Sequence, residues 1–159
     1  SCSAVVWTII KNSSGDWRTL FRGETSGADH QVIVQAGGWN IGMYDNINGT
    51  GFNSTGYSQQ SLPGYGSGAW NMLVWRWAST SYSYYYYNFC YNDSPGTTRG
   101  YISSSNARFK CGFRTLGAYN SGSPSQFWGS IGYVAMYNRY ISDDDVMQHF
   151  YSQRGRFGI

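Results

Sequence analysis

The chain has 159 residues, a formal net charge of +3, 19% aromatic residues and only 12% charged residues. This length fits one domain, and aromatic side chains at such density exclude a disordered chain. The arginines are scattered rather than clustered, and no apolar run approaches the roughly 18 residues that cross a membrane, so we expect neither a nucleic-acid partner nor membrane insertion. The chain opens on strand-like sequence without an initiator Met or a signal peptide, so we expect residues 1–159 to be one domain of a larger protein.

Aromatic and β-branched runs alternate with Gly, Asn and Ser turns, which predicts a series of strands. The predicted strands cover residues 3–10, 17–22, 30–35, 39–44, 71–78, 82–91, 97–102, 107–116 and 129–137. Alternation over the second run predicts that Trp17, Thr19 and Phe21 share a face. Gly37 and Gly38 predict a hairpin between the third and fourth. Residues 45–69 are rich in Asn, Gly, Ser and Gln, and we interpret them as a long irregular connection of the kind that often carries function.

Only the C-terminal end has a helical pattern. Ser142 is a suitable N-cap, and the three aspartates that follow it suit the positive end of a helix dipole. Val146 and Phe150 are four residues apart, so they can pack on a sheet together. The predicted fold class is therefore all-β, an antiparallel two-sheet jelly-roll sandwich with one short C-terminal helix.

Catalytic residue types are scarce. Glu24 is the only glutamate, and a glycosidase needs two carboxylates beside the scissile bond, for which Asp29 and Asp45 are the only candidate pair. Three cysteines, Cys2, Cys90 and Cys111, without a C-x-x-C spacing argue against a zinc site. Whether Cys90 and Cys111 form a disulfide stays open.

The segment from Gly129 to Val146, with Tyr-Asn-Arg followed by Ile-Ser and three aspartates, resembles the closing signature of the laminin-G-like branch of the concanavalin A-like lectin/glucanase superfamily. Residues 6–11 and 70–75 are similar to earlier strands of the same family. A narrower resemblance is to laminin-G-like domains of structural proteins of bacteriophages and large DNA viruses. Its short motifs are residues 17–20, 29–32, 42–46, 95–97 and 156–158.

The resemblance implies a sandwich fold and, for many members, one Ca²⁺ at the rim. Asp45, Asn46 and Asn48, with Asp29 facing them, would supply oxygen ligands, although a network of Asx turns is the favoured interpretation of these residues. Apart from this ion we expect no cofactor. The glucanase motif Glu-x-Asp-x-x-Glu is absent from the sequence, so we expect no enzyme activity.

Binding is the function that the remaining residues favour. Saccharides stack on flat apolar faces and are discriminated by planar polar side chains, and the chain is rich in both. We expect ligand-binding residues at the end of the predicted strand 39–44, in the 45–69 connection and on the predicted strands 71–78 and 82–91. These residues are Tyr44, Asp45, Asn46, Tyr57, Trp75, Trp77, Tyr85 and Tyr87.

The sequence therefore predicts a non-catalytic carbohydrate-binding module that recognises a cell-surface glycan, serves attachment and lies on a virion surface or outside cells. Other subunits of a virion or surface assembly are the second kind of partner. The alternatives are a protein–protein interaction or capsid-decorating domain, which a tyrosine-rich surface also suits, and, less favoured, a glycoside hydrolase.

Overall fold

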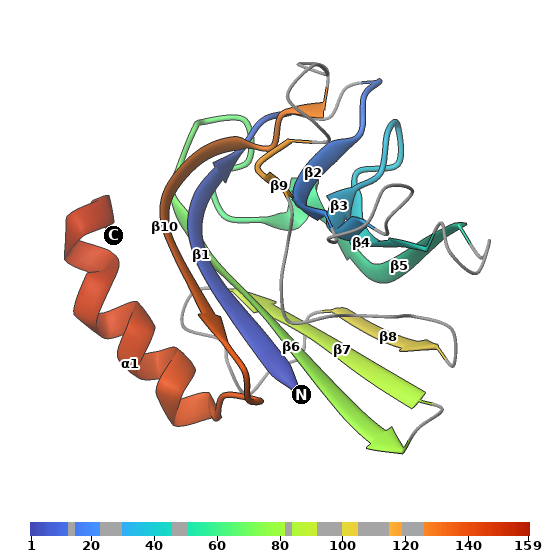
Figure 1. Cartoon of the computed structure of the whole chain (residues 1–159). Coiled ribbons are helices and arrows are strands. Elements are labelled where there is room, and N and C mark those ends of the chain that lie inside the picture. The colour runs from blue at the N-terminus through green and yellow to red at the C-terminus, as the bar shows by residue number, and fades with distance from the viewer. Residues whose placement is uncertain are drawn as a thin grey trace.

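The computed structural model describes residues 1–12, 15–22, 30–45, 51–81, 84–91, 100–104, 115–118 and 126–159. For residues 30–31, 45, 78–81, 84–91 and 100–104 it describes the backbone alone. The described part of the chain forms two five-stranded antiparallel sheets and one α-helix (Figure 1). The predicted β-sandwich with a short C-terminal helix is confirmed.

Sheet A and sheet B are defined by their strand order. Sheet A runs β10 (Gly129–Tyr137), β1 (Cys2–Ile10), β6 (Asn71–Ser81), β7 (Tyr84–Tyr91) and β8 (Gly100–Ser104). Sheet B runs β5 (Gly51–Ser58), β4 (Asn40–Asp45), β3 (His30–Val34), β2 (Arg18–Arg22) and β9 (Thr115–Leu116). A short 3-10 helix, η1 (Gln59–Ser61), follows β5, and the chain ends in α1 (Asp143–Gln153) and η3 (Arg154–Phe157).

Two sequence-based expectations about these strands were wrong. The stretch from 45 to 69 contains β5 and η1, because pairing with β4 holds Gly- and Ser-rich residues extended despite their low strand propensity. In β2 the alternation breaks at an irregularity between Thr19 and Phe21, so that Leu20 and Phe21 both enter the core. The hairpin between β3 and β4 and the bounds of β10 agree with the prediction.

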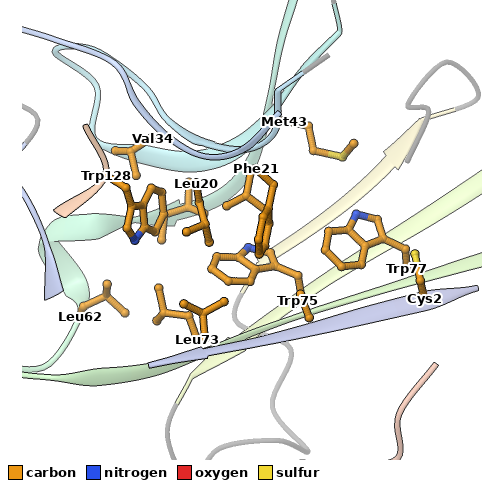
Figure 2. Packing of buried hydrophobic residues seen from close by; sticks show 14 residues of the cluster. Cys2, Leu20, Phe21, Val34, Met43, Leu62, Leu73, Trp75, Trp77 and Trp128 are labelled. Atoms are coloured by element: carbon orange, nitrogen blue, oxygen red, sulfur yellow. The ribbon is translucent and has the colours of Figure 1, made fainter. Parts of the chain in front are cut away.

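The main core lies between the two sheets. Trp75 and Trp77 project from β6 toward Phe21 and Met43 of sheet B (Figure 2). The ring centroids of Trp75 and Phe21 lie 6.3 Å apart at an interplanar angle of 79°, and Trp75 meets Trp128 at the same distance. Edge-on aromatic contacts of this kind stabilise a core beyond the area that they bury.

A second cluster covers the other face of sheet A. There α1 packs along β1 and β10, on the side of sheet A that faces away from sheet B (Figure 1). Trp7 is fully buried in this cluster, with Phe157 stacked on it at 4.5 Å and Phe150 at 5.8 Å. As predicted, Val146 and Phe150 form the buried stripe of the helix.

The start of α1 is held by polar contacts. Ser142 and Asp145 form a capping box, in which the Ser142 hydroxyl accepts from the Asp145 N–H and the Asp145 carboxylate accepts from the Ser142 N–H. Arg76 of β6, 5% exposed, donates to the Asp143 carboxylate at 2.6 Å and to the Ile141 carbonyl at 3.3 Å. These bonds fix the helix on sheet A.

No helix in the described part of the chain is both long and apolar enough to cross a membrane.

Candidate functional site

Three aromatic side chains gather on the outer face of sheet B, which is the face turned away from the core. Ile41 and Met43 of β4 point into the core, so Gly42 and Tyr44 lie on the outer side. Tyr44 pairs with Phe52 of β5, which places that residue on the same side. Trp17, just before β2, joins them. We call Trp17, Tyr44 and Phe52 the aromatic face.

Trp17 holds the aromatic face together. Its ring meets that of Tyr44 edge-on, with centroids 5.5 Å apart and an interplanar angle of 87°. It meets the Phe52 ring at 5.4 Å and 65°. All three side chains are partly exposed. Their rings therefore pack against one another and still present surface that a ligand can contact.

Gly42 provides the space in which the Phe52 ring lies. A Cβ at Gly42 would lie 2.9 Å from two atoms of that ring and would press on the Asn53 carbonyl oxygen. Gly42 pairs with Ile33 on one side and Ser54 on the other. Ile33 is 2% exposed, whereas Ser54 is exposed, so the pairing passes from a buried residue of β3 to a polar surface residue of β5.

Trp17 stands between two charged residues in the sequence, Asp16 and Arg18, and of these Asp16 is exposed. The Arg18 guanidinium lies 3.9 Å from the Asp16 carboxylate, but it is 3% exposed and donates two hydrogen bonds to the Asn12 carbonyl, at 2.8 and 3.2 Å. Arg18 therefore anchors the approach to β2, and the exposed Asp16 carboxylate lies within ion-pair distance of it.

Two of the predicted ligand-binding residues have a different role. Trp75 is fully buried and Trp77 is 2% exposed, and both lie between the sheets (Figure 2). The prediction that they bind ligand was wrong: their alternation with Arg76 correctly predicts a two-faced strand, but the tryptophan face is the core face. A glycan at the surface cannot reach either indole.

Tyr57 also belongs with the core side of sheet B. It packs against the main core, and its phenol donates to the Ser61 carbonyl at 2.9 Å, which ties β5 to η1. The structure therefore does not bring Tyr57 to Tyr44, because the two residues lie on opposite sides of the sheet. Of the residues that we predicted from the sequence, Tyr44 is the one placed on the aromatic face.

The other predicted site residues lie outside what the structure describes in full. Asp45, Tyr85 and Tyr87 are described as backbone in β4 and β7, and Asn46, Asn48 and Asp29 are outside the described residues. Calcium binding at Asp45 and Asn46 thus stays a prediction. Within the described ranges there is no group of three or more His, Cys, Asp or Glu side chains that could hold a metal ion.

A polar cavity lies between β10 and α1, where Tyr137 and His149 form a hydrogen bond through the phenol and Nε2. Burial lowers the pKa of His149 and raises that of Tyr137. Asp145 faces the same cavity, but Arg139 binds it through two hydrogen bonds, at 2.8 and 3.1 Å, and together with Ser142 holds the pKa of that carboxyl far below its usual range. A carboxylate so stabilised serves the helix cap and is a poor proton donor for glycoside hydrolysis.

Sequence reasoning missed Trp17 and Phe52 as site residues. Trp17 was grouped with Phe21 by strict alternation, and the irregularity in β2 separates the two. Phe52 was assigned to an irregular connection. The Gly- and Ser-rich sequence around Phe52 gives no local signal for an outward-facing strand.

The fold is similar to that of carbohydrate-binding modules from a bacterial sialidase. The chain matches three solved structures of the CBM40 module of the Ruminococcus gnavus IT-sialidase over 94% of its own length and 82% of theirs. The TM-scores are 0.59 for the module alone, 0.56 for the module bound to α2,3-sialyllactose and 0.59 for the module bound to α2,6-sialyllactose, at 13–14% sequence identity. At this level of identity the likeness shows a shared fold.

No protein-family model matches the sequence. No curated protein sequence matches it either.

Proposed function

We propose that the protein is a non-catalytic carbohydrate-binding module that holds a glycan on the aromatic face of sheet B. The observation that carries the proposal is the cluster of Trp17, Tyr44 and Phe52, partly exposed on a sheet face that α1 does not cover. Aromatic surface with a polar rim suits the alternating C–H and hydroxyl faces of a sugar. The likeness to sialidase CBM40 modules supports the same assignment.

The charge beside this face favours a neutral glycan. The similar modules were solved with sialyllactose, whose sialic acid carries a carboxylate. In the described residues around Trp17, the accessible charge is Asp16, and Arg18 is buried on the Asn12 carbonyl. The buried Arg18 guanidinium is out of reach of a ligand carboxylate, so lactose should bind at least as tightly as either sialyllactose.

The test is isothermal titration calorimetry of the purified domain with lactose, α2,3-sialyllactose and α2,6-sialyllactose, preceded by a broad glycan array. Trp17→Ala should weaken the Kd at least about tenfold, a change of about 1.4 kcal/mol. Tyr151→Ala is the matched control, because Tyr151 is an aromatic residue, 52% exposed on α1, and remote from sheet B. A blank array with folded protein, or equal binding by the Trp17 and Tyr151 variants, would contradict the proposal.

We also propose that the module acts on a virion or another extracellular surface, recognising a cell-surface glycan for attachment beside other subunits of such an assembly. The support is the resemblance of its sequence to laminin-G-like domains of viral structural proteins. Repeated display would raise the effective concentration of a weak single site.

Titration in EDTA against added Ca²⁺ tests the predicted calcium site. Glycan binding that is lost in EDTA and restored by Ca²⁺ would support a metal near Asp45.

A further inference from the structure

A second concave site lies at the end of the sandwich where β1 finishes. It is a cavity of about 240 Å³ between the last residues of β1, the helix η1 and the loop 62–69. Ile9 and Ile10 form one wall, and Leu62 and Ala69 form part of the other. None of the residues that line this cavity belongs to the aromatic face, so any ligand held here would be additional to the one proposed above.

Among the described residues, the lining of the cavity carries amides and a phenol but no charged side chain. Its polar members are Asn12, Gln59, Tyr65 and Asn71. The phenol of Tyr65 donates to the Asn12 side-chain oxygen at 2.8 Å and so joins the loop to the end of β1. Amides and hydroxyls on an apolar wall recognise uncharged ligands that carry several hydroxyl groups, whereas an ionic ligand would find no counter-charge.

Gln59 contributes a buried hydrogen-bond acceptor. The residue is 1% exposed, and its amide nitrogen donates to the Lys11 carbonyl at 3.1 Å. Its side-chain oxygen Oε1 is buried and makes no hydrogen bond to any described residue. An atom buried to this degree offers no surface to a ligand, so Gln59 shapes the cavity through its bond to Lys11, which ties η1 to the end of β1.

The loop that closes the cavity is held by its own hydrogen bonds. The Tyr65 N–H donates to the Leu62 carbonyl at 3.1 Å, and the Asn71 side chain donates to the Pro63 carbonyl at 3.1 Å. Gly64 has a φ of +66°, and a Cβ there would press on the Ala69 side chain, so the turn requires glycine. A preformed wall binds without the entropy cost of ordering a loop.

We infer that this cavity is a second glycan subsite, one that takes a single neutral sugar ring. Its size supports a small ligand, because pockets for drug-sized molecules are larger, at about 300–1,000 Å³. The inference extends the proposed function and stands apart from the aromatic face. The two sites lie at opposite ends of β5: Phe52 is near its start, and Gln59 follows its last residue, Ser58, which is about 20 Å from Phe52 along an extended strand. Substitutions at such a separation act independently.

The test is a ¹H–¹⁵N NMR titration of the whole chain with D-galactose, D-glucose and N-acetyl-D-glucosamine, each up to tens of millimolar. We expect saturable shifts of the backbone amides of residues 64–69 and of the side-chain amides of Gln59 and Asn71. Tyr65→Ala should weaken the Kd at this site at least about fivefold. Ala69→Leu, which adds bulk at the cavity wall and keeps every polar group, is the second variant and should have the same effect.

Trp17→Ala separates the two proposals. Cavity shifts that persist in Trp17→Ala and weaken in both cavity variants support the second subsite, whether or not the aromatic face binds. In the wild-type protein, shifts confined to the Trp17 indole and its neighbours would overturn the subsite and leave the proposed function intact. Glycerol at the same hydroxyl concentration is the control for a non-specific polyol effect. An equal response to glycerol, or no saturable response at the cavity to any sugar, would overturn the inference.

Discussion

The outer faces of the two sheets have the same kinds of side chain and different surroundings. On sheet A, Trp7 lies beneath Phe157 and Phe150, nearly parallel to both, and is fully buried. On sheet B, Trp17 meets Tyr44 and Phe52 edge-on and stays partly exposed. The C-terminal segment covers the first face. In the described part of the chain, no helix covers the second.

The difference indicates that exposure, rather than composition, decides whether an aromatic cluster can offer surface to a ligand. A covered cluster contributes to folding, because its whole apolar area is removed from water. An open cluster keeps part of that area for a ligand and contributes less to stability. The comparison therefore predicts opposite profiles for substitutions on the two faces: loss of stability on sheet A and loss of binding on sheet B.

The largest effect is expected from Trp7→Ala. Truncating a fully buried tryptophan leaves a large cavity and lowers the free energy of unfolding by about 3–5 kcal/mol. The matched change Trp17→Ala should lower it by roughly 1–2 kcal/mol, because that ring is only partly buried. Guanidinium denaturation of both variants measures the two values. Equal losses would remove the distinction between the covered and the open face.

Phe157→Ala tests whether the C-terminal segment acts as a cover. Its ring stacks on Trp7 and lies 5.0 Å from the Trp70 ring, so its removal should lower the free energy of unfolding by about 2 kcal/mol. Ile159→Ala, two residues on and 47% exposed, should change it by no more than about 0.5 kcal/mol. Thermal unfolding compares them. If Phe157→Ala were as mild as Ile159→Ala, the stack would be incidental.

Gly42→Ala tests whether the position of the Phe52 ring matters for stability and for glycan binding. The added methyl group would press on the Asn53 carbonyl and on the Phe52 ring, so β5 must shift, at a cost of about 1–3 kcal/mol. The displaced ring should also weaken glycan binding, as measured by calorimetry. Gly155→Ala is the control, because a Cβ there meets nothing within 4 Å. Unchanged binding by Gly42→Ala would show that the position of Phe52 is immaterial to the ligand.

The sequence predicts the covered face far better than the open one. The bounds of β10 and the cap and buried stripe of α1 follow from local signals: a β-branched run, Ser142 before three aspartates, and a spacing of four between Val146 and Phe150. In each case the residues that decide the structure are neighbours in the chain.

The aromatic face depends on contacts between distant residues. Trp17 and Phe52 are 35 positions apart, and they meet only because β2 to β5 pair in order and Gly42 leaves room between them. Alternation likewise shows that Trp75 and Trp77 share a face, yet it cannot tell which face the second sheet will cover. The choice between core and surface is made by tertiary packing, which local patterns do not contain.

The smallest effect concerns His149, at the margin of the covered face. Burial lowers its pKa in the folded protein, so between that pKa and the ordinary value of 6.5 the unfolded chain binds more protons. Stability should therefore fall as the pH is lowered through this window, and it should be regained above it. The groups that face the ring are Tyr133 and Tyr137 of β10, and Asp145 of α1 partly opposes the shift.

His149→Gln removes this titration while keeping a polar side chain beside Tyr137. The decrease in melting temperature between pH 7.5 and pH 5 should then be smaller than in the wild-type protein. The pH dependence of glycan binding at sheet B should be the same in the wild-type protein and in His149→Gln, because the helix lies on the opposite side of the molecule (Figure 1). An identical pH profile of stability in both proteins would mean that His149 titrates alike in the folded and unfolded chain.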